Sequence, residues 1–172
     1  MILTLFTITL LGILIYQDFK TRSVSILVMG ILFILFCIQA FDAERTLIAV
    51  GIPFLFNLIL VIVQLVSVGV YFLLRKKKYA SLVDTVIGLG DIAFMVICTI
   101  AFSTANFLVF YVASLLIALV GTGLLRILKN DRTDIPLVGY MAFMLVVCII
   151  LKLSTTSFDF YNDAFLLNII NN

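Results

Sequence analysis

Six long apolar stretches constrain the fold of this chain more than any other feature of its sequence. They cover about residues 1–17, 24–41, 46–74, 82–102, 106–128 and 136–153. A helix that crosses a bilayer needs roughly 20 apolar residues, and about 17 can suffice. Of all residues, 65% are apolar and 12% are charged, whereas a soluble domain is about half apolar and about a quarter charged. We therefore expect an all-α, polytopic membrane bundle of about six transmembrane helices.

The basic residues divide unequally between the two sides of this predicted bundle. Lys and Arg concentrate on the cytoplasmic side of membrane proteins. The connections after the first, third and fifth stretches are therefore expected in the cytosol, with both termini outside it. Residues 1–153 are expected to form the bundle, and 154–172 a short amphipathic or irregular tail. Those three connections hold nine of the 11 basic residues: Lys20, Arg22, Arg75, Lys76, Lys77, Lys78, Arg126, Lys129 and Arg132.

Residues that are missing exclude many kinds of chemistry. The chain has no His, which excludes Ser-His and Cys-His nucleophilic pairs and His-based zinc sites. Cys37, Cys98 and Cys148 lie in separate apolar stretches and none belongs to a C-x-x-C pair, so we interpret them as apolar packing residues. The net charge of +2 is too small to suggest nucleic acid as a partner. The sequence predicts no metal and no cofactor.

Two aspartates stand at the edges of apolar stretches. Asp18 closes the first stretch, and Asp91 follows Gly88 and Gly90 in the fourth. Both fall on the predicted cytosolic side. An ionisable group within a spanning segment is costly and points to function. Asp18 taken alone also fits a solvated interfacial residue, which is how we interpret Asp84.

Two carboxylates without a His, a metal cluster or a nucleophile–base pair favour aspartic-protease chemistry. Two aspartates close together do not both ionise easily, so one keeps a proton while the other acts as a base. The ionised group takes a proton from water, and the protonated group stabilises the developing oxyanion. This hypothesis requires that the ends of the first and fourth helices that carry Asp18 and Asp91 meet.

The two motifs around these aspartates resemble those of the type IV prepilin leader peptidases and the archaeal preflagellin peptidases, which are membrane aspartic proteases. The similar segments are residues 18–22 with Val24, and 88–91 with the pattern G-x-G-D. Residues 135–139 are more weakly similar to the family's Ile-Pro-Phe-Gly-Pro stretch. The resemblance implies catalysis by Asp18 and Asp91, with Gly88 and Gly90 shaping the backbone. It also implies a prokaryotic plasma membrane, and cleavage of a prepilin-like substrate, with a basic leader and a hydrophobic helix, at the cytosolic face.

The chain also departs from the family pattern. Ala93 stands where the family usually has Lys, Ser25 replaces a Pro, and Tyr140 stands in place of the second Pro of the last motif. The methylating region of many bacterial members is missing, so N-methylation of the product is not expected. Two alternatives stay open. One is a catalytically silent relative that acts as a pilus or secretion scaffold, and the other is an ion-coupled transporter that uses the aspartates as proton carriers.

Overall fold

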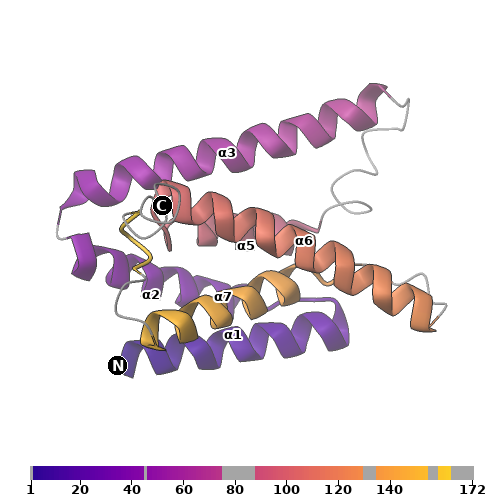
Figure 1. Ribbon diagram of the computed structural model, residues 1–172, viewed down its shortest axis with the longest axis horizontal. Helices are drawn as coiled ribbons and strands as arrows, with labels where there is room; N and C mark the ends of the chain where they lie inside the picture. The colour runs from indigo at the N-terminus through magenta and orange to yellow at the C-terminus, as the bar shows by residue number, and fades with distance from the viewer. Residues whose placement is uncertain (1, 45, 75–87, 130–134, 155–158, 164–172) are drawn as a thin grey trace, which may run out of the picture.

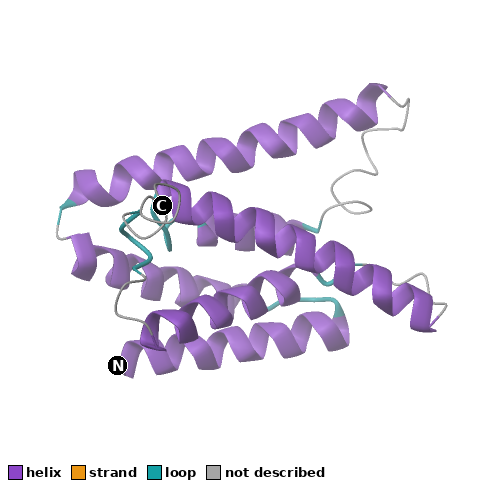
Figure 2. Ribbon diagram, in the orientation of Figure 1, coloured by secondary structure: helices purple, strands orange, loops and turns teal. Residues whose placement is uncertain are grey.

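The computed structural model describes residues 2–44, 46–74, 88–129, 135–154 and 159–163. Within these ranges the chain is helical and contains no strand, which confirms the all-α prediction (Figures 1 and 2). The helices run alternately up and down the long axis of the bundle (Figure 1). Their bounds are α1 (Ile2–Thr21), α2 (Ile26–Glu44), α3 (Leu47–Leu74), α5 (Leu89–Cys98), α6 (Thr104–Lys129) and α7 (Leu137–Ser154).

Five of these helices are long and apolar enough to cross a membrane, namely α1, α2, α3, α6 and α7. Large apolar side chains such as Ile34, Leu116 and Phe143 are exposed on their outer faces, as expected for contact with lipid. The fourth predicted span, 82–102, is the exception. Its described helix, α5, has only 10 residues. Two features predicted at or just before this span lie outside the described residues, namely the basic run Arg75–Lys78 and the interfacial acid Asp84.

A buried asparagine explains how α5 can end so early. Asn57 of α3 is 0% exposed, and its Nδ2 donates hydrogen bonds to the carbonyl oxygens of Thr99 (2.9 Å) and Phe102 (3.0 Å). An unpaired backbone group inside a bilayer costs several kcal/mol. The asparagine thus satisfies backbone groups that a longer helix would have paired by itself.

Helix α7 is the central packing element. It lies alongside α1 (Figure 1), and it also packs against α6. The core between these helices includes Leu11, Leu14, Met141 and Leu145, which are fully buried. Because α1 and α7 are antiparallel, the end of α1 lies beside the start of α7. We call this end of the bundle the aspartate end, since Asp18 lies there, and the opposite end the far end.

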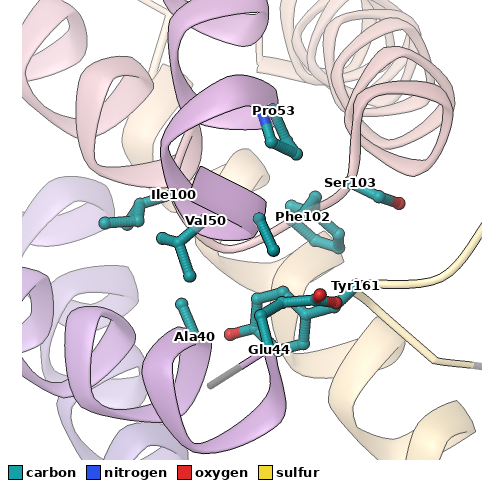
Figure 3. A pocket seen from close by; sticks show the side chains of 9 residues that line it. Ala40, Glu44, Val50, Pro53, Ile100, Phe102, Ser103 and Tyr161 are labelled. Carbon is teal, nitrogen blue, oxygen red and sulfur yellow. The ribbon is translucent and has the colours of Figure 1, made fainter. Parts of the chain in front are cut away.

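Residues 159–163 are not helical, and they cover the far end by docking onto the start of α6. The buried Phe160 stacks near Phe102, with ring centroids 4.9 Å apart. A cavity between this segment, α2 and α3 has a volume of only about 10 Å³, which is room for about one water molecule. Figure 3 shows the side chains that line it. This cavity is too small to serve as a substrate site.

Candidate active site

Asp18 lies in the last turn of α1 with only 7% of its surface exposed. Its Oδ2 accepts a 2.6 Å hydrogen bond from the backbone N–H of Gly139, in the first turn of α7. Such a short bond from an N–H to a carboxylate is a strong one. The positive charge of Arg22 also acts on Asp18. The carboxylate is therefore held by a backbone N–H of α7, which lies 121 positions further along the chain.

Asp91 is the third residue of α5. Its Oδ2 accepts a hydrogen bond from the backbone N–H of Gly88, over 3.2 Å. Gly88 is the N-cap residue, so this contact forms one half of a capping box. The local pattern G-x-G-D thus has a structural role in starting α5. Because the cap uses Oδ2, it does not engage the second carboxyl oxygen.

The two aspartates line one cleft, and they are close enough for their charges to interact. The backbone N–H of Val138 lies close enough to the Asp91 carboxylate to interact with its charge. Helix α5 packs chiefly on α2 and α7. The first turn of α7 therefore adjoins both aspartates: the N–H of Gly139 donates to Asp18, and Val138 lies near Asp91.

The cleft beside the two aspartates is large and open. Its volume is about 1610 Å³, which exceeds the roughly 300–1,000 Å³ of typical small-molecule sites. Its polar lining gathers around Asp18, Arg22 and Asp91. The rest of its lining is largely apolar, with Met29 and Phe33 from α2, Val96 from α5, and Leu115 and Leu119 from α6. A cleft of this size and polarity can hold a length of polypeptide with an apolar part.

The two glycines of the G-x-G-D motif differ in their surroundings. A Cβ atom on Gly90 would lie 2.5 Å from Cγ2 of Val24, so only glycine permits this contact between α5 and the connection after α1. A Cβ atom on Gly88 would lie 3.3 Å from Oδ2 of Asp91. Gly90 therefore allows a close approach of two segments, and Gly88 lies next to the carboxylate itself.

The other residues singled out in the sequence fall in several places. Ala93 is exposed and lines the same cleft as the two aspartates. Cys98 and Cys148 are buried and Cys37 is half-buried, and all three are free. Within the described ranges no three His, Cys, Asp or Glu side chains group in a way that would hold a metal ion.

Sequence reasoning missed the direct part that the start of α7 plays in this site. Residues 135–139 carry only a weak resemblance in the sequence, yet the N–H of Gly139 donates to Asp18, and Val138 lies near Asp91. A glycine in the first turn of an apolar helix, after a proline, was the available signal.

Comparisons of the chain with models of protein families, with curated protein sequences and with solved structures give no match. Function is therefore inferred from the motifs and from the geometry of the cleft.

Proposed function

We propose that this chain is a membrane aspartic endopeptidase that resembles the prepilin peptidases. One observation carries the proposal: Asp18 and Asp91, which are 73 positions apart in the numbering, line one open cleft and interact electrostatically. A buried carboxylate and a half-buried one that share a site are costly to ionise together. Such a pair is suited to hold one proton between two acids.

In the proposed reaction, the ionised carboxylate takes a proton from a water molecule. The water oxygen attacks the carbon of the scissile peptide bond while the protonated carboxyl gives its proton to the carbonyl oxygen. The tetrahedral intermediate then collapses. The C–N bond breaks, the nitrogen receives a proton from one carboxyl of the dyad, and one hydroxyl of the intermediate returns its proton to the other carboxylate. The products are a carboxylic acid and an amine, and the dyad again shares one proton. No cofactor is needed for this sequence of steps.

The proposed substrate is a prepilin-like protein with a basic leader followed by a hydrophobic helix. The apolar lining of the cleft supports this choice, because Phe33, Val96 and Leu115 extend it away from the aspartates along the helices. An apolar helix in the bilayer could lie in that part while the peptide bond at its end reaches the carboxylates.

We further propose that the aspartate end faces the cytosol of a prokaryotic cell and that the chain lies in the plasma membrane. The basic residues Lys20 and Arg22 next to the site support this orientation. Single cysteines near Arg22, in a background without the three native cysteines, should be shielded from an impermeant thiol reagent in intact cells. Labelling from outside would contradict the proposed orientation, but it would not bear on the proposed cleavage reaction.

The direct test is a cleavage assay. The purified protein in lipid nanodiscs is incubated with a prepilin-like substrate encoded by a neighbouring gene. Mass spectrometry of the products should show one cut, at the junction of leader and helix. The cut should not occur with Asp18→Asn. A fully folded wild-type protein that leaves several such substrates intact would contradict the proposal.

Ala93 is the observation that favours the second candidate, a catalytically silent scaffold for a pilus or secretion assembly. Its small side chain lines the cleft at the position where the related family carries a Lys. A scaffold would still bind the substrate helix but would never release a cut leader. Co-purification of intact substrate with wild type and with Asp18→Asn alike would support this candidate.

A further inference from the structure

The first turn of α7 makes the closest contact to the aspartate pair. The Gly139 N–H donates to Oδ2 of Asp18 over 2.6 Å, and the neighbouring backbone of Val138 lies close enough to Asp91 to interact with its charge. N–H groups in the first turn of a helix have no partner within the helix, and they carry a partial positive charge. Here one such group donates to Asp18 and the next lies near Asp91, and these two carboxylates would otherwise repel each other.

Gly139 has no room for a side chain. A Cβ atom there would lie 2.7 and 2.8 Å from ring carbons of Phe19, and 3.2 Å from Oδ2 of Asp18. The Phe19 ring is itself in edge contact with Tyr140, with centroids 5.2 Å apart. Glycine therefore suits this position because it has no side chain, which lets α7 approach close enough to donate to Asp18.

We propose that Gly139 is a positioning residue for the catalytic pair, because the absence of its side chain lets the first turn of α7 approach the cleft and donate its N–H to Asp18. This inference rests on the proposed peptidase function. Gly139 itself touches no reacting atom. It acts by holding Asp18 in a fixed place and by stabilising the charge on its Oδ2, so that Asp18 faces Asp91 in the geometry that catalysis needs.

The test compares Gly139→Ala with Gly123→Ala. A Cβ atom on Gly123 meets nothing within 4 Å, so this variant controls for adding a methyl group to a helix. Alanine is a better helix former than glycine, so neither change weakens its helix by propensity. Gly139→Ala should lower kcat on the order of 100-fold, the usual cost of a displacement of about 1 Å. KM should stay within about twofold of wild type, because the apolar part of the cleft still binds substrate.

A rescue experiment separates positioning from damage to the fold. In Gly139→Ala, the added methyl group collides first with Phe19. Adding Phe19→Ala opens space for it, so the double variant should recover part of the lost kcat. Equal activity of Gly139→Ala and Gly123→Ala, or a change confined to KM, would overturn the proposal.

Infrared spectroscopy tests the same contact without any substrate. The carboxylate stretching band that disappears in Asp18→Asn belongs to Asp18, and its frequency should shift in Gly139→Ala but not in Gly123→Ala. If wild type cleaves nothing while this band shifts, the peptidase function fails and the positioning contact stands. If wild type cleaves and the band does not move, the positioning role alone is wrong.

Discussion

Acidic side chains lie at the start of a helix at both ends of the bundle, but their hydrogen-bond donors and the space beside them differ. At the far end, Asp163 lies at the start of α6. Its Oδ1 accepts hydrogen bonds from the Ser103 hydroxyl (2.5 Å) and the Asn106 N–H (3.1 Å), and its Oδ2 accepts one from the Ala105 N–H (3.5 Å). The carboxylate thus has three protein donors, and no second acid of the described residues shares them.

The half-buried Asp163 belongs to a polar network. The side-chain amide of Asn106 donates to backbone oxygens of residues 159, 160 and 162, and the N–H of Ser103 donates to the carbonyl oxygen of Phe160. The adjoining cavity has room for only about one water. This acid is a helix cap with no large cleft beside it among the described residues.

At the aspartate end, the donors are shared between two acids, and a large cleft lies beside them. The comparison shows what separates a structural acid from a candidate catalytic one. A helix start stabilises a carboxylate in both places. Only a second carboxylate and access for water and peptide make the charge available for proton transfer.

The largest expected effect tests whether the acids of the aspartate end are catalytic and the acid of the far end is not. Asp18→Asn and Asp91→Asn should each lower cleavage roughly 1,000-fold or more, and the double variant should be hardly worse, because members of a catalytic unit fail together. The matched change at the far end, Asp163→Asn, should leave kcat within about twofold. Cleavage rates and thermal unfolding in detergent check both. Near-normal cleavage by either dyad variant would mean that the pair is assigned wrongly.

The second prediction concerns stability at the far end. Asp163→Ala removes the cap of α6 and should lower the free energy of unfolding by about 1–2 kcal/mol, the upper range for helix caps. Asp42→Ala is a matched control, because Asp42 is an exposed acid in the last turns of α2, and it should change stability by less than about 0.5 kcal/mol. If the two variants unfold alike in a denaturant titration, Asp163 is not a structural cap.

Much of the fold could be predicted from apolar length alone. The predicted stretch 46–74 corresponds closely to α3 (Leu47–Leu74), and 136–153 to α7 (Leu137–Ser154). Lipid imposes this regularity, because every backbone group must be paired within a helix. The short α5 was not predictable in this way. Its end depends on Asn57, which lies in another helix and is brought to Thr99 by packing.

The candidate site was predictable only in part. The two carboxylates stood out because charge at the edge of an apolar stretch is expensive. The donors that hold them did not stand out, because they are backbone N–H groups, of Gly88 for Asp91 and of Gly139 for Asp18, and every sequence carries such groups. Likewise, the docking of residues 159–163 depends on backbone oxygens, and the tail's composition alone suggested an amphipathic or irregular segment.

The third prediction sharpens the electrostatic side of the comparison. Ala93→Lys should shift the acid limb of the pH–rate profile to lower pH, because a positive charge favours the ionised carboxylate. Among the described residues, the charged groups in the cleft lining are Asp18, Asp91 and Arg22. At a separation of about 7 Å in a water-filled cleft, the new attraction is about 0.6 kcal/mol, or roughly 0.4 pH units. Ala93→Gln is the neutral control. An identical profile for Lys and Gln would mean that the charge at position 93 does not reach the pair.

The smallest expected effect lies at the surface of the far end. Lys152 pairs with Asp159 over 2.9 Å, but both side chains are partly exposed, at 39% and 48%. Lys152 also lies over the rings of Phe160 and Tyr161, with Nζ 5.0 and 5.4 Å from their centroids. Lys152→Met keeps the apolar stem over the rings and removes the charge. It should therefore cost less than about 1 kcal/mol of unfolding free energy, and the loss should shrink at high salt if the pair is solvated. A loss as large as that of Asp163→Ala, unchanged by salt, would mean that this pair lies in a low-dielectric region. The pair would then hold residues 159–163 onto the bundle as strongly as Asp163 does.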